Sequence, residues 1–504
     1  MVYYNFHMIH YLLELEESVL DNSTELRQVV YSVLLTQIQF GFYRYGEKLP
    51  AIEETSTRLC VSVDTARAAY LKLKTRGYIT LIKNAGATVK VKYDSRETEQ
   101  FIQTFFSARK HAMIDLGKSL QPLFGTAQWT GLKYATPEDL QTMELLFSKE
   151  DAASPYAMLE HLNLKYRALG NHILMRLVWQ SFMFLHNPFF SLRDNLRYFD
   201  RDADYLSAVL VFCREKDWSA LRAAVAGSIE KLPSALIRFY EDRITTPPPE
   251  AETPFVWSSY KKSRQLCYSL AMELLTSISL GQYPVGSLLP SQEELARQKG
   301  VSVSTVRRAL LLLDSIGAIK SAKYIGTRVL PFDKTAENSD FTRPVLQRRL
   351  MDMAESLQIL ALSCQAVSQL TLSSLNTTFV EQLCRDLKAH RQRRRGETLS
   401  YFLLGLIGNH APYQTIRTVY TELLRQIFWA HAFHGMKGSA DTIHAIYDPY
   451  YDTFIDSLEH LNFLRFSVTL EALILFELRC TVDYLLHFNV PGAENILVPD
   501  SSFR

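Results

Sequence analysis

The chain has 504 residues, 47% of them hydrophobic and 12% aromatic, so it can bury several cores, and its length suggests roughly three to four domains. A formal net charge of +2 does not by itself indicate a nucleic-acid partner, and six scattered cysteines without a Cys-x-x-Cys pair argue against a disulfide framework and a zinc site. No apolar stretch is free enough of charge to predict a membrane span, and acidic residues within positions 1–20 argue against a signal peptide, so we expect a cytoplasmic protein without a membrane partner.

The N-terminal quarter of the chain predicts a small domain built from short helices. Residues 1–24 are expected to form a helical extension, and residues 26–38 carry apolar side chains at helical spacing up to a stop at Gly41. Residues 51–59 predict a short second helix. Ser62 then stands where the N-cap of a third helix belongs, and Gly77 ends that helix.

A hairpin is predicted directly after the third helix. Residues 78–82 and 88–91 read as two short strands, and Lys83 lies in the turn between them. A helix-turn-helix followed by such a hairpin is a winged helix, which we assign to residues 25–95. Residues 96–244 are rich in apolar side chains at spacings of three and four and predict an all-helical domain. Residues 245–257 contain several prolines and predict an extended linker.

The second half of the chain repeats this plan. Residues 41–89 recur without a gap at numbers 240 higher, with about 20 identities over 49 positions, which indicates a duplicated domain. We therefore assign a second winged helix to residues 258–333 and a second all-helical domain to residues 334–504. The fold class is predicted as mainly α, a duplicated unit of winged helix-turn-helix and all-helical domain. Residues 170–172 and 408–410, both Gly-Asn-His, suggest that the duplication includes the helical domains.

The recognition helix of the second copy is the clearest candidate site. Val306, Ala309, Leu310 and Leu313 predict its buried stripe, which leaves the polar residues around positions 304–308 outside. Arginine can donate two hydrogen bonds to guanine, and serine or threonine can contact bases or phosphates. The candidate DNA-binding residues of the second copy are Ser291, Ser302, Ser304, Thr305, Arg307, Arg308, Lys323, Tyr324 and Gly326. Those of the first copy are Ser62, Thr65, Arg67, Lys83, Asn84 and Gly86.

Charge is concentrated in the two repeated segments. Residues 25–93 hold 11 basic and 5 acidic side chains, and residues 260–330 hold 10 basic and 4 acidic ones. The rest of the chain is acidic. Two basic domains in an acidic chain are expected of surfaces that meet a polyanion.

The motif residues resemble the DNA-binding domain of the GntR (gluconate-repressor-like) transcription regulators. The resemblance covers about 70 residues in each half and rests in the second copy on Leu289-Pro-Ser-Gln-Glu-Glu-Leu-Ala296, Gly300-Val-Ser302, Thr305-Val-Arg307, Ala309-Leu310, Gly317 and Gly326-Thr327. It implies DNA contacts from the residue after Leu-Pro, the polar start of the recognition helix, the following arginine and the wing tip. In this sequence those positions are Ser291, Ser304, Thr305, Arg307, Lys323 and Gly326.

Both copies depart from the pattern of that family, the first copy more strongly. Val63 and Val303 stand where many members have arginine, as do Glu53 and Glu293 in the second helix. In the first copy, moreover, Cys60 replaces the turn glycine, Asp64 stands where Ser304 does, and Ala68 replaces Arg308. The second copy is therefore expected to bind DNA more strongly than the first, which is either a weaker reader or a scaffold.

The remaining motifs give no catalytic or metal site. No Ser/His/Asp or Cys/His arrangement and no phosphate loop are present, so we expect no enzymatic activity and assign no cofactor. His431 and His434 form an i, i+3 pair, but ordinary core or surface histidines are the preferred interpretation and no metal is assigned. The basic run 391–395 is interpreted as a solvated helix end, and Trp129, Trp179, Trp429 and Tyr447 as core residues.

The resulting hypothesis is a bacterial-type regulator that binds double-stranded operator DNA through two winged-helix heads. One chain could supply both heads as an internal pseudo-dimer, or the chain could form a homodimer. A ligand for the helical domains stays open: a small-molecule effector, a peptide or none. The alternative function is a protein-interaction scaffold whose winged helices no longer bind DNA.

Overall fold

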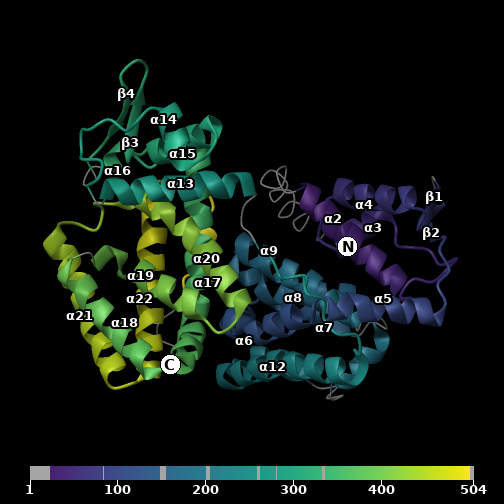
Figure 1. The fold of residues 1–504 in the computed structure, drawn as a ribbon. Helices are drawn as coiled ribbons and strands as arrows, with labels where there is room; N and C mark the ends of the chain where they lie inside the picture. The colour runs from purple at the N-terminus through teal and green to yellow at the C-terminus, as the bar shows by residue number, and fades with distance from the viewer. Residues whose placement is uncertain are drawn as a thin grey trace. The chain divides into compact units, whose positions relative to one another are not determined.

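The computed structural model describes residues 23–82, 85–147, 155–199, 205–257, 262–279, 281–331, 335–394 and 396–499. Backbone contacts divide the chain into two compact units, Met1–Val256 and Trp257–Arg504. Each unit begins with a winged-helix part and continues into a larger helical part (Figure 1). The fold is mainly α-helical with a small hairpin in each unit, as the sequence predicted.

The first head, residues 23–93, is a winged helix. Its elements are α2 (Ser23–Gln39), α3 (Ile52–Arg58), α4 (Val63–Thr75), β1 (Ile79–Ile82) and β2 (Gly86–Val89). The two strands are antiparallel, with Ile79 opposite Val89 and Ile82 opposite Gly86. Leu34, Leu59, Tyr70 and Leu73 are fully buried at the centre of the head. Its core continues without a break into residues of the helical part, including Tyr156, Trp179 and Phe182.

The helical part of the first unit follows directly. Its helices are α5 (Ser95–Ser107), α6 (Lys110–Lys133), α7 (Pro137–Phe147), α8 (Pro155–Tyr166), η1 (Arg167–Leu169), α9 (His172–Ser181), η2 (Phe182–His186), α10 (Asn187–Phe190), η3 (Arg193–Tyr198), α11 (Tyr205–Glu215) and α12 (Trp218–Arg243). The long helices α6 and α12 pack against each other. Segment η2 is a π-helical turn that joins α9 to α10.

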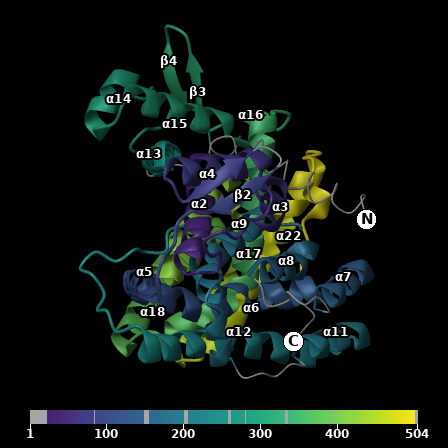
Figure 2. The same cartoon turned by 90° about the vertical axis from the view of Figure 1, so that its right-hand side faces the viewer.

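The second head, residues 262–331, repeats the plan of the first. Its elements are α13 (Lys262–Ser279), α14 (Gln292–Lys299), α15 (Val303–Ser315), β3 (Ile319–Ala322) and β4 (Gly326–Val329). Ile319 lies opposite Val329 and Ala322 opposite Gly326, the same register as in the first head. Within this unit the hairpin projects away from the helical part, as the two views show (Figures 1 and 2).

The helical part of the second unit is built around a long antiparallel pair, α17 and α22. Its elements are α16 (Thr335–Asn338), α17 (Pro344–Ser374), α18 (Thr377–Gln392), η5 (Gly396–Thr398), α19 (Leu399–His410), α20 (Gln414–Gln426), η6 (Ile427–Phe433), α21 (Ala440–Glu459), α22 (Phe463–His487) and η7 (Ala493–Asn495). Within the residues that the structure describes, no helix is long and apolar enough to cross a membrane.

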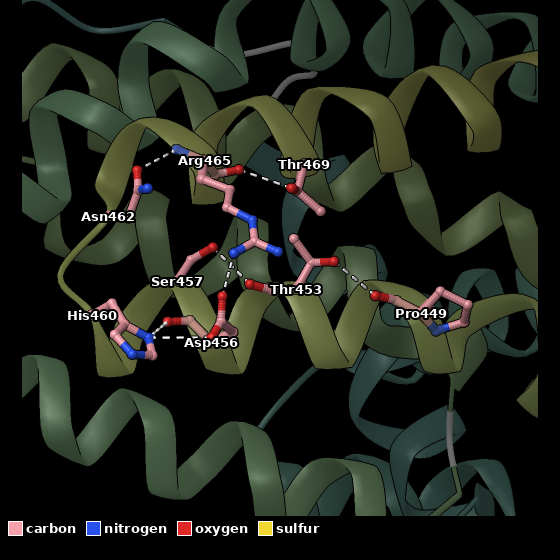
Figure 3. Close-up of polar contacts among 8 residues, drawn as sticks. All are labelled: Pro449, Thr453, Asp456, Ser457, His460, Asn462, Arg465 and Thr469. Carbon is pink, nitrogen blue, oxygen red and sulfur yellow. Dashed lines mark hydrogen bonds and ion pairs between the residues drawn. The ribbon is translucent and has the colours of Figure 1, made fainter.

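A turn with the same construction precedes the last long helix of each unit. In the second unit Leu461 takes the left-handed conformation (φ 51°), and the Asn462 side chain caps α22 by accepting from the Arg465 N–H at 3.0 Å. The Arg465 guanidinium reaches back to Asp456 on α21 (Figure 3). In the first unit Lys216 is left-handed (φ 58°), and Asp217 caps α12. The two turns share a left-handed residue followed by a side-chain cap at the start of a long helix.

The two Gly-Asn-His triplets are not evidence that the duplication includes the helical parts. Asn171 caps α9 by accepting from the Leu174 N–H at 2.7 Å, so the first triplet starts a helix. Residues 408–410 instead form the last turn of α19. The sequence match between the triplets does not correspond to a shared structural position.

Candidate nucleic-acid interface

Two serine caps fix the start of the helix-turn-helix in the second head. Ser291 Oγ accepts a hydrogen bond from the Glu294 N–H at 3.1 Å and so begins α14. Ser302 Oγ accepts from the Thr305 N–H at 3.1 Å and so begins α15. Such caps satisfy N–H groups that have no partner within the helix, which defines the first helical residue. Both caps agree with the sequence prediction.

The buried stripe of α15 determines which side chains face outward. Val306, Ala309, Leu310 and Leu313 are all at most 3% exposed, as predicted. Ser304, Arg307 and Arg308 are exposed on the opposite side of the same turns. The Arg307 Nε lies 3.4 Å from Gln292 Oε1, and Arg308 forms no ion pair with any described residue. The start of α15 thus offers two cationic side chains and a hydroxyl to solvent.

Thr305 occupies an intermediate position in this surface. Its side chain is half-buried, and its hydroxyl lies 2.8 Å from Ser302 Oγ. It can therefore both complete the cap of α15 and keep one edge accessible.

The wing tip of the second head is fully accessible. Lys323, Tyr324 and Gly326 are exposed, and the Lys323 Nζ lies 4.9 Å from the centre of the Tyr324 ring. Tyr324 takes a left-handed conformation with φ 65°, which is uncommon for a residue other than glycine, and Gly326 has φ 110°. Two further exposed apolar residues, Ile325 and Leu288, are not among the residues that the sequence predicted for this site.

The first head presents a weaker version of this surface. Ser62 Oγ caps α4 by accepting from the Thr65 N–H at 3.1 Å. Asp64 and Arg67 are both exposed, but Arg67 Nη1 lies 2.6 Å from Asp64 Oδ1, so the cation is already paired. Thr65 is only 3% exposed and its hydroxyl lies 2.9 Å from Ser62 Oγ, so it completes the cap and offers no hydroxyl to DNA.

The wing of the first head is only partly described. Gly86 is exposed at the start of β2 with φ 87°. Lys83 and Asn84, the other two predicted wing residues of this head, lie outside the described residues.

The turn between α3 and α4 of the first head is packed against the helical part of its unit. Cys60 adopts φ 53°, close to the φ of 63° at Gly300, so the cysteine takes the left-handed conformation that the family assigns to glycine. Cys60 Sγ accepts a hydrogen bond from Asn163 Nδ2 at 3.1 Å, and burial raises the pKa of the thiol to about 11. Trp179 Nε1 donates to the Leu59 carbonyl oxygen at 2.7 Å.

The basic run of the second helical part is paired with acidic side chains. Arg391 contacts Asp448 at 2.9 Å and Asp452 at 2.8 Å, and Arg394 contacts Asp441 at 2.7 Å. All three carboxylates belong to α21, so these arginines join α18 to α21. This pairing supports the structural interpretation of the run.

Two histidines of the second helical part lie beside aspartates. His460 Nδ1 lies 3.2 Å from Asp456 Oδ1 at the turn before α22 (Figure 3), and His444 Nε2 lies 3.4 Å from Asp448 Oδ2. Among the described residues, no three His, Cys, Asp or Glu side chains gather as a metal ion would require.

Comparison with known families agrees with the geometry of both heads. Residues 26–89 and 268–329 match the profile described as "Bacterial regulatory proteins, gntR family". Both heads are gntR-family winged helices. The two matched segments coincide with α2 to β2 and with most of α13 to β4, so the gntR resemblance seen in the sequence is confirmed in both copies.

Curated relatives match the chain over a short segment. An uncharacterized HTH-type transcriptional regulator of Escherichia coli K12, YieP, is 41% identical over 68 residues, which are 14% of this chain and 30% of that protein. The HTH-type transcriptional regulator Rv1152 of Mycobacterium tuberculosis is 32% identical over 75 residues, 15% of this chain and 62% of that protein. The chain therefore spans about a third of the first relative and less than two thirds of the second.

Two solved structures resemble the chain over less than half of its length. Streptococcus agalactiae GntR covers 42% of this chain and 99% of its own at 18% identity, with a TM-score of 0.19. E. coli McbR/YncC covers 43% of this chain and 98% of its own, also at 18% identity, with a TM-score of 0.22. The family assignment rests on the sequence matches.

Proposed function

We propose that the protein is a non-enzymatic, sequence-specific DNA-binding transcription regulator in which the second head is the principal reader. The observation that carries this proposal is the exposed start of α15, where Ser304, Arg307 and Arg308 lie together within a gntR-family winged helix. A helix of this type enters the major groove with its first turns, and arginine there forms paired hydrogen bonds with guanine. Lys323 and Gly326 at the wing tip contact the neighbouring backbone or minor groove.

The first head is proposed as a second, weaker reader. It retains the capped recognition helix, but its exposed arginine is paired with Asp64 and the arginine after it is replaced by Ala68. A carboxylate beside DNA phosphates repels them, while the same carboxylate can accept a hydrogen bond from cytosine. Two unequal heads favour an imperfect palindrome as the DNA site, read either by one chain as an internal pseudo-dimer or by a homodimer.

A small-molecule effector is proposed for the first helical part. Asn187, in the turn after η2, is 1% exposed, and neither polar atom of its amide has a hydrogen-bond partner among the described residues. Burial lowers the pKa of Lys165 to about 8, and Lys165 has no acidic partner in the described part of the chain. Burial, together with the charge of Lys165, lowers the pKa of His186 to about 4. A buried amide without a partner, such as that of Asn187, favours a polar ligand.

The function is tested by DNA binding of two double variants that each remove two adjacent arginines. Genomic fragments bound by the wild type are recovered and used in gel-shift titrations with Arg307→Ala/Arg308→Ala and with Arg393→Ala/Arg394→Ala. The first variant is expected to lose at least about 30-fold in affinity for the specific site, since each arginine-to-base contact contributes about 1–3 kcal/mol. The second variant is the control and should bind like the wild type.

Salt dependence separates the proposal from the scaffold alternative. Wild-type affinity should fall steeply as salt rises, because basic side chains that contact phosphates release counterions. If the wild type binds no DNA at low salt, the scaffold interpretation replaces this proposal. If both double variants bind equally well, the recognition helix has been assigned to the wrong surface.

A further inference from the structure

The wing tip of the second head carries an exposed apolar patch. Tyr324 is 93% exposed, Ile325 60% and Leu288 48%. Tyr324 and Ile325 lie in the turn between β3 and β4, and Leu288 forms a bridge with Arg328 on β4. Both methyl carbons of Leu288 lie within 3.7 Å of the position that a Cβ atom would take on Gly326. Leu288 thus lies next to Gly326, the residue that directly follows Tyr324 and Ile325 in the hairpin.

The backbone holds this patch in place. The turn is closed by a hydrogen bond from the Ile325 N–H to the Ala322 carbonyl oxygen at 3.2 Å, and Ala322 pairs with Gly326 at the end of the ladder. Tyr324 adopts φ 65°, a conformation that costs an aromatic residue free energy and suits asparagine or glycine. A large apolar side chain kept in a strained and fully exposed position indicates a role outside the core of the head.

Positive charge surrounds the apolar tip. Lys320 on β3, Lys323 in the turn and Arg328 on β4 are all exposed. The hairpin also projects away from the helical part of its unit (Figures 1 and 2). An apolar tip surrounded by cations fits a groove lined with phosphates better than it fits an apolar protein surface. Proteins that enter the minor groove combine these features, because apolar wedges separate base pairs while lysine and arginine contact the backbone.

The first head lacks the patch at equivalent positions. The 240-residue offset pairs Leu288 with Lys48, Tyr324 with Asn84 and Ile325 with Ala85. The rest of the wing keeps the same strand register in both heads. The apolar tip is therefore a property of the second head and not a requirement of the fold.

We infer that Tyr324 and Ile325 insert into the minor groove beside the site read by α15 and partly separate one base step, so that the second head bends its DNA. This inference rests on the proposed DNA-binding function and adds a mode of recognition to it. Pyrimidine–purine steps unstack more easily than others. The second head should therefore prefer a TA or CA step beside the site read by α15. It need not contact base edges at that step.

The test transfers the wing-tip residues of the first head into the second. The triple variant Leu288→Lys/Tyr324→Asn/Ile325→Ala keeps a hairpin sequence that the chain already uses, and circular dichroism confirms its folding. DNA bending is measured by energy transfer between dyes at the two ends of the recovered duplex. A second series of duplexes replaces the flanking TA step with AA. It also replaces guanine with inosine, which removes the amino group of guanine from the minor groove.

The expected results distinguish insertion of the wing tip into the minor groove from other roles of the tip. The wild type should bend the duplex by about 20° or more and prefer the TA duplex about tenfold. The triple variant should still protect the α15 site but lose the bend and the preference. Lys323→Ala is the control: it should weaken binding to every duplex alike, lower the salt slope by about one and keep the bend.

Several outcomes would overturn the inference. A bound but straight wild-type duplex excludes insertion while leaving the proposed function intact, whereas the absence of any DNA binding contradicts the function itself. A bend that persists in the triple variant assigns the distortion to other residues. If the triple variant keeps the bend but loses self-association in light scattering, the patch is a contact between copies of this chain.

Discussion

The two heads share one fold but contact their helical parts at opposite ends of the recognition helix. In the first head the turn before α4 is packed, with Asn163 on Cys60 and Trp179 on the Leu59 carbonyl, while a Cβ atom added at Gly77 after α4 would meet no heavy atom within 4 Å. In the second head the turn before α15 is open, since a Cβ atom on Gly300 would meet nothing within 4 Å.

At the C-terminal end of the recognition helix the packing is reversed: the second head is packed there and the first is open. A Cβ atom added at Gly317 after α15 would lie 2.7 Å from the Thr335 carbonyl oxygen and 2.9 Å from Asn338 Cβ, both on α16. The first helical part thus touches the turn that leads into the start of α4, whereas α16 contacts the second head at the C-terminal end of α15. We expect the first head to respond to changes in its helical part more directly than the second.

The largest expected effect comes from Gly317→Ala. Alanine must take the left-handed conformation (φ 67°) and must also displace α16, so the variant should lose about 2–5 kcal/mol of stability from backbone strain and overpacking together. Gly77→Ala is the matched control, because it has a similar φ of 81° but open space around the new methyl group. It should lose only about 1–2 kcal/mol.

Chemical denaturation followed separately for the two units measures this difference. Hydrogen exchange of residues 303–331 should accelerate in the Gly317 variant, and exchange of residues 63–89 should change little in the Gly77 variant. Equal losses from the two substitutions would contradict the packing difference between the heads.

A smaller effect is expected from Trp179→Phe, which removes the hydrogen bond to the Leu59 carbonyl and keeps most of the ring. The buried carbonyl loses its partner, so we expect a loss of about 1–2 kcal/mol and faster amide exchange over residues 52–66. Trp129→Phe is the control, because Trp129 Nε1 donates to the Trp218 carbonyl at 3.1 Å within the helical part. If both variants accelerate exchange over residues 52–66 alike, the contact does not anchor the first head.

Local sequence signals were sufficient to predict the heads. Serines before helices, glycines at positive φ and the stripe Val306, Ala309, Leu310 and Leu313 each act within a few residues, so the winged helix could be assigned from spacing alone. Trp179, Trp429 and Tyr447 lie in the core as predicted, at most 8% exposed, while Trp129 is half-buried.

The attachments of the heads could not be predicted in this way. Trp179 and Leu59 are 120 residues apart and Asn163 and Cys60 are 103 residues apart, and no periodicity connects either pair. Thr65 shows the same limit within a head. It is identical to Thr305 in sequence, yet it is buried while Thr305 keeps an accessible edge, because burial depends on neighbouring elements.

The smallest expected effect, Asp64→Ser, concerns DNA binding by the first head. Serine is the residue at the equivalent position 304, so the helix start already tolerates it. The substitution removes the Asp64 carboxylate and releases Arg67 from an exposed ion pair. If the first head reads DNA as proposed, its half-site should gain about three- to tenfold in affinity. Its salt dependence should become steeper, because Arg67 can then contact a phosphate.

Footprinting of both half-sites on one duplex with the full-length chain measures this effect. Ser304→Asp supplies the reciprocal change and should weaken the half-site of the second head. The two variants should shift occupancy in opposite directions: Asp64→Ser toward equal half-sites, and Ser304→Asp toward loss of the stronger one. If the wild type already fills both half-sites equally at limiting protein, the charge difference at the start of the recognition helices does not determine which head binds DNA more tightly. The difference would then have to lie in how each head is attached to its helical part.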